Sequence, residues 1–388
     1  MKRTTSRTAI VGGLLALVLA ACGSSSSSTS GDGATTTKAS SAASSAAPTT
    51  AGGSSTTASS AAATTAAPVA KPSATLNASG STFSKAYQEE AAKAFSDKNK
   101  GVTINYAGGG SGKGRQDLAD QLVDFAGSDS PYKEADLAKN KGGDVLYFPV
   151  LMGPITLSYN LDGVDKLQLS ADTIAKIFQR QITKWNDAAI AADNPSAKLP
   201  DTAITVAHRS DGSGTTQNFT EYLVKAAPTT WTLKSGSTVE WPADTQAGNG
   251  NAGVAQAITA TAGAIGYVDL SDAVAAKLKF AAIKNKAGKY VEPSAEAASA
   301  AGEGVTVADN LIFQGTNPDG EKAYPITAQT FIIVYAKQTD KAKADALKAY
   351  LTYLITDGQK LLPDLDYAPL PKSIADKALA QLAKITVG

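Results

Sequence analysis

The chain has 388 residues, with 36 basic and 35 acidic side chains, so its formal net charge at pH 7 is +1. A charge this close to zero excludes the broad basic surface on which nucleic-acid binding depends, and no nucleic-acid partner is expected. The single cysteine and single histidine exclude an internal disulfide bond and argue against a zinc site, so neither a metal nor a cofactor is expected.

The N-terminus predicts an exported protein. Three basic residues are followed by an apolar run, Ala9–Ala21, and then by Cys22. The run is too short for a membrane-spanning helix, which needs about 20 residues, and a basic start with a short apolar stretch is typical of a signal peptide, here residues 1–21. The segment LAAC resembles a lipobox, in which Cys22 becomes lipid-modified; the alternative is a signal peptide with a chance cysteine.

Residues 22–73 are predicted to be the lipidated cysteine followed by a disordered tether. Residues 23–72 are almost wholly Ser, Thr, Ala and Gly, and cannot bury enough apolar area to offset chain entropy. A random coil of about 50 residues spans roughly 40 Å. A partner-binding or O-glycosylated segment remains the alternative.

About 315 residues remain from Ala74 onward, which is large for one core and indicates two lobes. Strand-like and helix-like patterns alternate along them, which favours an α/β fold. Strands are expected at 102–106, 145–150, 204–207 and 331–335, and helices at 116–123, 170–178 with Ser170 as N-cap, and 341–355.

The first candidate anion-binding loop, Asn77–Phe83, precedes a helical pattern. Small polar residues at a helix start leave N–H groups free, and the helix dipole favours negative charge there. Thr82 adds a hydroxyl. Simple N-capping by Ser81 or Thr82 is the alternative.

The second loop, GGGSGKG at 108–114, lacks the full P-loop pattern, which requires Gly at Ala107 and Ser or Thr at Gly114. A glycine-rich turn between a strand and a helix still forms a nest of N–H groups for an anion, with Ser111 as the expected hydroxyl donor. A flexible surface loop is the alternative.

The third loop follows the strand-like VDFAGSD and presents Asp129 at the carboxyl end of that strand, where ligands bind in α/β sheets. Capping of the following turn is the alternative for this carboxylate.

The fourth loop, HRSDGSGTT at 208–216, joins a strand to a helix. Arg209 offers a fixed fork of donors, and Ser213, Gly214 and Thr215 lie at the helix start. Asp211 is explained equally well by a simple salt bridge with Arg209. Each loop is a weak signal alone, and the four together indicate a site for a small anion.

These motifs resemble the phosphate-binding protein of the high-affinity phosphate ABC importer, over nearly all of 77–370. The segments that carry the resemblance are GSTF, GGGSGKG, VDFAGSDSPY, ITKWND, HRSDGSGTTQNFTEYL, GNGNAGVA, AIGYVDL and YPIT. The long tether and the GGGSGKG variant depart from the family pattern, so Lys113 has no assigned role.

The resemblance implies a type II periplasmic-binding-protein-like fold, with ligand in a cleft between two lobes. Lobe I would comprise 74–157 and 325–388, lobe II 158–324, with hinge strands near 152–158 and 324–327. The implied phosphate contacts are Thr82, Phe83 (N–H), Ser111, Asp129, Arg209, Ser213, Gly214 (N–H) and Thr215, with Asp211 bracing Arg209.

A carboxylate in an anion site has a chemical reason. Phosphate near neutral pH keeps a P–OH group, and a buried carboxylate can accept a hydrogen bond from it. Sulfate offers only lone pairs. An unmatched buried group can reject the wrong ligand by roughly 10⁴–10⁵-fold. We assign this selectivity to Asp129 and the bracing of Arg209 to Asp211.

Three alternatives remain. A hydrolase using Ser213 is disfavoured because the side chain of His208, the only histidine, should point to the opposite face from Arg209; no enzyme is expected. The others are a binding protein for sulfate or arsenate, and a lipoprotein acting as sensor or adhesin. The resemblance implies an ABC permease and ATPase as partners, and a monomer on the outer face of the bacterial cytoplasmic membrane, held by the lipid anchor.

Overall fold

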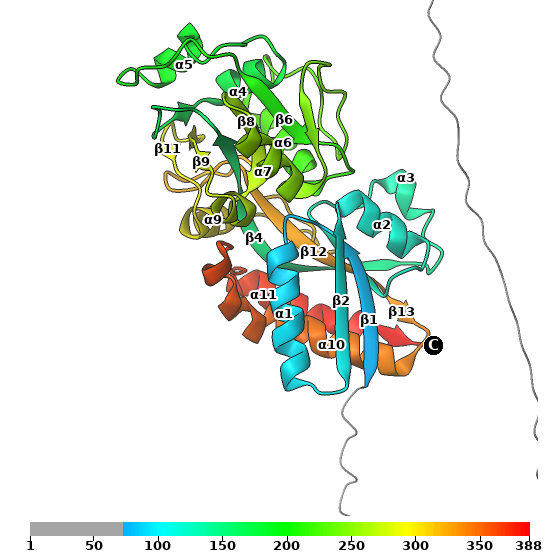
Figure 1. Cartoon of the computed structure of the whole chain (residues 1–388). Helices are drawn as coiled ribbons and strands as arrows, with labels where there is room; N and C mark the ends of the chain where they lie inside the picture. The colour runs from blue at the N-terminus through cyan, green and yellow to red at the C-terminus, as the bar shows by residue number, and fades with distance from the viewer. Residues whose placement is uncertain (1–72) are drawn as a thin grey trace, which may run out of the picture. The chain divides into compact units, whose positions relative to one another are not determined.

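The computed structural model describes residues 73–388, so the predicted signal peptide, Cys22 and the predicted tether up to residue 72 lie outside the described residues. Strands and helices alternate along the chain, as predicted (Figure 1). The main strands are β1 (Ala74–Gly80), β2 (Val102–Gly109), β3 (Phe125–Ser128), β4 (Val145–Tyr159), β6 (Thr205–Arg209), β7 (Gln246–Gly248), β8 (Ala264–Asp269) and β12 (Thr327–Tyr335). The shorter strands are β5 (Gln168–Leu169), β9 (Lys279–Phe280), β10 (Ala282–Lys284), β11 (Tyr290–Val291), β13 (Lys337–Gln338) and β14 (Thr386–Val387).

The helices lie between these strands. They are α1 (Lys85–Lys98), α2 (Ser111–Ala119), α3 (Glu134–Leu137), α4 (Ala171–Phe178), α5 (Ala188–Asp193), α6 (Gly214–Ala226), α7 (Gly250–Ala260), α8 (Leu270–Ala275), α9 (Ala295–Gly302), α10 (Lys341–Ile355) and α11 (Lys372–Gln381). The predicted helix at 341–355 is confirmed, as is Ser170 as the N-cap of α4. Within residues 73–388, no helix is long and apolar enough to cross a membrane.

One nine-stranded sheet connects the two lobes. Its strand order is β2-β1-β3-β12-β4-β8-β6-β7, with β9 added on β4. The strands β2, β1, β3 and β12 lie in lobe I, and β8, β6 and β7 lie in lobe II. Because β1 pairs in parallel with both β2 and β3, and β6 in parallel with β7 and β8, the carboxyl ends of these strands meet at common edges. This is the edge of an α/β sheet at which ligands bind.

Strand β4 belongs to both lobes. Val145–Pro154 pair with β12, apart from Val150 at a register shift, and Ile155–Tyr159 pair with β8. The chain returns beside it just before β12, where the Ile155 N–H donates to Ile326 O (2.8 Å) and the Tyr324 hydroxyl donates to Ile155 O (2.9 Å). The two segments that cross between the lobes are therefore hydrogen-bonded neighbours. The predicted residue limits of the lobes remain a prediction.

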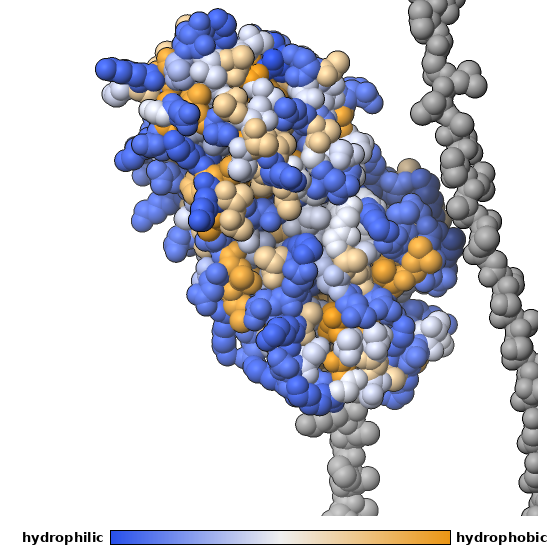
Figure 2. Space-filling model, viewed as in Figure 1, coloured by the Kyte–Doolittle hydropathy of each residue, from blue (hydrophilic) through white to orange (hydrophobic). Residues whose placement is uncertain are grey.

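The sheet of lobe I is buried on both faces. Alternate residues of β12 enter different apolar clusters: Phe331 and Ile333 contact the α2 side, and Ile332 and Val334 contact the side of α1 and α10. A strand covered on both faces reads as a continuous apolar run, which explains the sequence FIIVY. The face drawn in Figure 2 is mostly hydrophilic, with smaller hydrophobic areas.

Several predicted boundaries were wrong. The strand expected at 145–150 continues to Tyr159, and the strand expected at 331–335 begins at Thr327. Asn77–Gly80, expected as loop, completes β1, because Leu76 and Ala78 are buried while Asn77 is exposed. The helix expected at 116–123 begins earlier, at Ser111, and ends at Ala119. Its end is fixed by Gln121, whose φ of 59° leaves the helical region while the Leu122 N–H donates to Asp117 O (2.8 Å).

Gly80 ends β1 with a φ of +137°, and a Cβ there would overlap Gly127 O on the paired strand β3. We expect the overlap in Gly80→Ala to lower the free energy of unfolding by about 3 kcal/mol, because the main chain at Gly127 cannot move aside. This loss adds to the cost of placing alanine at a positive φ. Gly288→Ala is the control: its φ is +80° and nothing lies within 4 Å, so only strain of about 1–2 kcal/mol is expected. Urea unfolding of both variants checks the difference, and equal losses would contradict the steric explanation.

Candidate functional site

All four predicted loops meet at the edge where the two lobes face each other. The first lies between β1 and α1, the second between β2 and α2, the third after β3, and the fourth between β6 and α6. Ser111 Oγ, from the second loop, donates to Asp129 Oδ2 of the third (3.1 Å). A Cβ built on Gly214 of the fourth loop would lie 2.7 Å from Asp129 Oδ2, so lobe II closely approaches this pair.

Asp129 is the buried acid of the site, with 1% of its surface exposed. Its Oδ1 accepts hydrogen bonds from Ser81 Oγ (2.6 Å) and Thr330 Oγ1 (2.7 Å), whereas Oδ2 accepts only from Ser111 Oγ. Burial raises the pKa of this carboxyl, against the lowering effect of the three hydroxyl donors and of the nearby Arg209 charge. The less occupied oxygen, Oδ2, is the one nearest Gly214.

Backbone N–H groups provide the positive part of the site. Among residues 73–388, no hydrogen-bond acceptor faces the N–H groups of Thr82, Phe83, Ser111, Gly214 or Thr215. These five groups belong to the N-terminal ends of α1, α2 and α6 or to the turns just before them. First-turn N–H groups have no acceptor within their own helix and carry the positive end of the helix dipole. Three helix starts from two lobes therefore present donors to one place.

Arg209 and Asp211 form the expected ion pair. Arg209 Nε donates to Asp211 Oδ1 (2.8 Å), and Nη2 pairs with Oδ2, so the carboxylate holds the guanidinium edge-on. Arg209 is 4% exposed, and its Nη1 donates to Thr215 Oγ1 (3.3 Å). Burial by itself would raise the pKa of Asp211, but the guanidinium bonds and charge, together with the Gly250 N–H, lower it below the ordinary value. Asp211 is thus a carboxylate that fixes a buried cation.

His208 does not share this site. Its Nδ1 lies 2.9 Å from Arg209 O and its Nε2 3.0 Å from Thr245 Oγ1, and its ring stacks on Trp241 with centroids 5.0 Å apart. Burial lowers its pKa, partly offset by the bond with Arg209 O. No nucleophile–base pair is formed with Ser213, whose Oγ accepts from the Thr216 N–H (3.0 Å) as the N-cap of α6.

The lobes contact each other through main chain beside the site. The Gly112 N–H of lobe I donates to Gly212 O of lobe II (2.7 Å), and a Cβ on Gly112 would lie 3.0 Å from that same oxygen. A Cβ on Gly110 would overlap Asp211 Oδ2. Gly110 and Gly112 of GGGSGKG are therefore required for close approach of the lobes, in addition to any N–H nest.

Several residues of the site were not predicted. They are Thr330, Gln329, Asn218, Arg115 and Asn251. Asn218 Nδ2 of lobe II donates to Asp129 O (2.7 Å), as does Gln329 Nε2 (2.9 Å). Arg115 Nη1 donates to Ser128 Oγ (2.7 Å) and Ser130 Oγ (2.9 Å), on either side of Asp129. Two of the five lie in motifs already noted: Asn218 in HRSDGSGTTQNFTEYL and Asn251 in GNGNAGVA.

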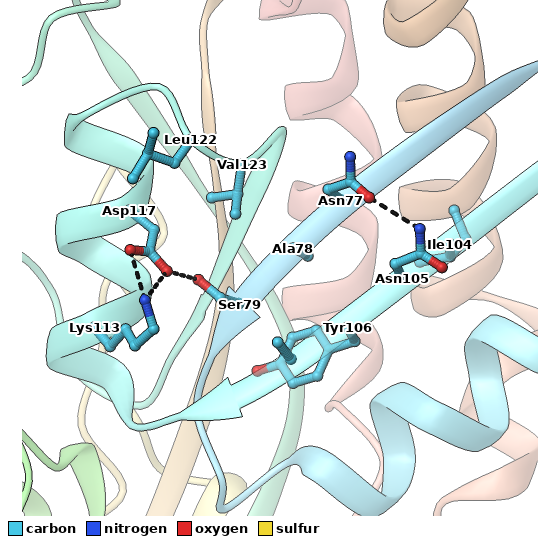
Figure 3. A pocket seen from close by; sticks show the side chains of 11 residues that line it. Asn77, Ala78, Ser79, Ile104, Asn105, Tyr106, Lys113, Asp117, Leu122 and Val123 are labelled. Atoms are coloured by element: carbon cyan, nitrogen blue, oxygen red, sulfur yellow. Dashed lines mark hydrogen bonds and ion pairs between the residues drawn. The ribbon is translucent and has the colours of Figure 1, made fainter. Parts of the chain in front are cut away.

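Lys113 serves a separate feature. An open groove of about 610 Å³ lies on lobe I between β1, β2 and the end of α2 (Figure 3). Lys113 Nζ pairs there with Asp117 Oδ2 (2.7 Å), which also accepts from Ser79 Oγ (2.6 Å). The lysine thus forms an i,i+4 ion pair within α2. Across residues 73–388, no group of three or more His, Cys, Asp or Glu side chains could hold a metal ion.

Comparison with known proteins identifies the family to which this chain is related. A family model described as a PBP superfamily domain matches residues 24–358. Phosphate-binding protein PstS of Xylella fastidiosa (strain Temecula1) is 39% identical over 291 residues, covering 73% of this chain and 78% of that protein. PstS of Pasteurella multocida (strain Pm70) is 36% identical over 314 residues, covering 79% and 89%.

Solved structures give the same fold at lower identity. A high affinity periplasmic phosphate-binding protein, PfluDING, bound with phosphate, aligns with a TM-score of 0.67 and 22% identity over 79% of this chain and 94% of that one. The phosphate-binding protein of Stenotrophomonas maltophilia aligns with a TM-score of 0.66 and 19% identity over 79% and 93%. The expected fold class, α/β with two periplasmic-binding-protein-like lobes, is confirmed. By its sequence identity over most of both chains, the protein belongs to the PstS family of phosphate-binding proteins within the PBP superfamily.

Proposed function

We propose that the protein binds inorganic phosphate between its lobes and delivers it to an ABC permease and its ATPase for import. The observation that carries this proposal is a buried carboxylate, Asp129, placed among unpaired N–H donors and beside a braced guanidinium. Donors alone would suit any small anion. A carboxylate acceptor among them suits an anion that still carries a proton.

The proposed contacts divide between donors and one acceptor. Thr82, Phe83 and Ser111 donate from lobe I; Arg209, Ser213, Gly214 and Thr215 donate from lobe II; and Asp129 accepts. Ser111 donates through its N–H, because its hydroxyl proton is engaged by Asp129 Oδ2. The Ser213 hydroxyl accepts from the Thr216 N–H, which leaves its own proton to donate. Phe83 contributes its N–H, while its buried ring packs against Tyr367 with centroids 5.9 Å apart. Asp211 contacts Arg209 rather than the anion.

Asp129 gives the site its selectivity. Oδ1 already accepts two hydrogen bonds, from Ser81 and Thr330, and these hold the carboxylate in place. Oδ2, with Ser111 alone, keeps room to accept one further hydrogen bond. A P–OH group supplies that bond, whereas a sulfate oxygen would face the carboxylate lone pair to lone pair at a buried position.

The transport role follows from a site that two lobes share. Lobe I, at 74–157 and 325–388, and lobe II, at 158–324, would separate by bending near 152–158 and 324–327 to admit and release phosphate. Cys22 would carry the lipid anchor, holding a monomer on the outer face of the bacterial cytoplasmic membrane by its tether. No enzymatic step is part of this function, because the related proteins are phosphate-binding proteins.

Calorimetric titration of the purified protein with phosphate, arsenate and sulfate tests the function. Phosphate and arsenate should bind, since both keep a protonated oxygen near neutral pH, and sulfate should not. Loss of phosphate import on deletion of the gene separates a transport component from a sensor. Sulfate binding as tight as phosphate binding would refute the proposal.

Replacing the acceptor should change which anion binds. Asp129→Asn offers an N–H₂ group where the wild type offers a lone pair, so phosphate binding should persist in weakened form while sulfate binding appears. We expect the phosphate-to-sulfate affinity ratio to fall by at least 100-fold in paired titrations, within the range that unmatched buried groups produce. Asp211→Asn is the matched control: it removes a carboxylate that does not touch the anion, so that ratio should stay within about threefold.

Gly214→Ala should weaken phosphate binding without weakening the fold. The added methyl would overlap Ser111 Oγ and lie 2.7 Å from Asp129 Oδ2 across the lobe contact, yet alanine is favourable in the first turn of α6. We expect at least a 100-fold loss of phosphate affinity, with the free energy of unfolding of the ligand-free variant unchanged or higher. Calorimetry and urea unfolding measure the two effects separately, and wild-type affinity would show that the lobes need not approach this closely.

The raised pKa of Asp129 predicts a pH-dependent difference in stability. Because the folded state holds this proton more tightly than the unfolded state does, the carboxyl favours folding below its ordinary pKa of 3.8, and that benefit is lost as pH rises through the folded-state pKa. Ligand-free Asp129→Asn should therefore be more stable than wild type at pH 7.5, with the difference shrinking toward pH 4. Urea unfolding in phosphate-free buffers measures it, with the exposed Asp364→Asn as charge control; a difference that grows toward acid pH would contradict the sign.

A further inference from the structure

Asn251 reaches from lobe II to lobe I at the site, although it is not one of the proposed contacts. It is fully buried in the first turn of α7. Its backbone N–H and its Nδ2 both donate to Thr82 Oγ1 of lobe I (3.2 Å each), and Nδ2 also donates to Thr215 Oγ1 of its own lobe (3.2 Å). One amide group thus contacts one proposed hydroxyl donor from each lobe.

Hydrogen-bond accounting shows what this contact does. A threonine hydroxyl has one proton to donate and two lone pairs to accept. Thr82 Oγ1 accepts twice from Asn251, and Thr215 Oγ1 accepts from Asn251 and from Arg209 Nη1 (3.3 Å). With both lone pairs of each oxygen engaged, each hydroxyl can act only as a donor.

The turn before α7 fixes Asn251 in place. Gly250 has a φ of +67°, a conformation that glycine adopts without strain, and its N–H donates to Asp211 Oδ1 (3.0 Å). The carboxylate that braces Arg209 therefore also anchors the turn that carries Asn251. The neighbouring Asn249 is exposed and forms no side-chain cap bond, so it provides a matched comparison within the same turn.

We propose that Asn251 is a positioning residue that directs the hydroxyl protons of Thr82 and Thr215 toward the bound anion, and does so only when the lobes are closed. This inference rests on the proposed phosphate-binding function. In this role Asn251 acts through the two threonines, to which its amide donates. A bound anion receives two pre-oriented O–H donors, and each lobe supplies one of them.

Phosphate titrations of Asn251→Ala and Asn249→Ala test the proposal. Asn251→Ala frees both hydroxyls to rotate, and we expect a 10- to 100-fold loss of phosphate affinity, whereas Asn249→Ala should stay within twofold of wild type. Asn251→Asp should lose more than Asn251→Ala, because a carboxylate accepts the two threonine protons instead of donating. Urea unfolding of the ligand-free variants shows whether they fold. If Asn251→Ala does not fold, Asn251→Ser takes its place, because a serine side chain is too short to reach either threonine.

Double-mutant cycles separate orientation from general packing. If Asn251 acts through the hydroxyls, Asn251→Ala should cost less in a Thr215→Val or a Thr82→Val background than in the wild type, because one of its two targets is already gone. With both threonines replaced by valine, it should cost at most about threefold. Additive losses in either cycle, or wild-type affinity in Asn251→Ala, would overturn the inference. Absence of phosphate binding by the wild type would instead overturn the proposed function, so the two failures are distinguishable.

Discussion

The burial of one carboxyl group constrains the rest of the site. Asp129 has lost nearly all contact with water, and burial opposes its charge. Three hydroxyl donors and the nearby guanidinium compensate, and they come from elements far apart in the sequence: Ser81 after β1, Ser111 at the start of α2, and Thr330 in β12. The strand order that places β3 between β1 and β12 is what brings these donors together.

The attraction for an anion is local rather than global. The chain has almost no net charge, so the field at the site must come from helix starts and from Arg209. Asp211 offsets part of the Arg209 charge and fixes the orientation of the guanidinium. The site therefore favours a ligand whose acceptors match the direction of the guanidinium donors over one that only carries negative charge. Recognition by aimed hydrogen bonds is consistent with a site that distinguishes anions of the same shape.

Sequence reasoning located the four loops because each combines small polar residues with a strand-to-helix transition, a pattern with a local physical cause. It placed Asn77–Gly80 in a loop because only Leu76 and Ala78 indicate a buried face there. It started α2 too late because glycines are poor helix formers, and tertiary contacts with Asp129 and Gly212 outweigh that preference.

The partners of Asp129 and the threonines were less accessible to prediction. Thr330 lies within an apolar strand pattern, and its bond to Asp129 spans 201 positions in the sequence. Asn251 lies in a motif that marks the family, but its reach across the lobes depends on how the two half-sheets face each other. Local patterns carry no information about such contacts. They follow from the path of β4 and its neighbour through both lobes.

The contact between Gly112 and Gly212 has a consequence for ligand size. Side chains can rotate to change the width of a gap, but here the lobes meet through main-chain atoms, with no side chain between them. The distance between the closed lobes at this contact is therefore set by van der Waals radii and one hydrogen bond. An anion with longer bonds than phosphate, such as arsenate, is then accommodated by small rotations of the surrounding hydroxyls and guanidinium, together with the few tenths of an ångström by which that hydrogen bond can lengthen.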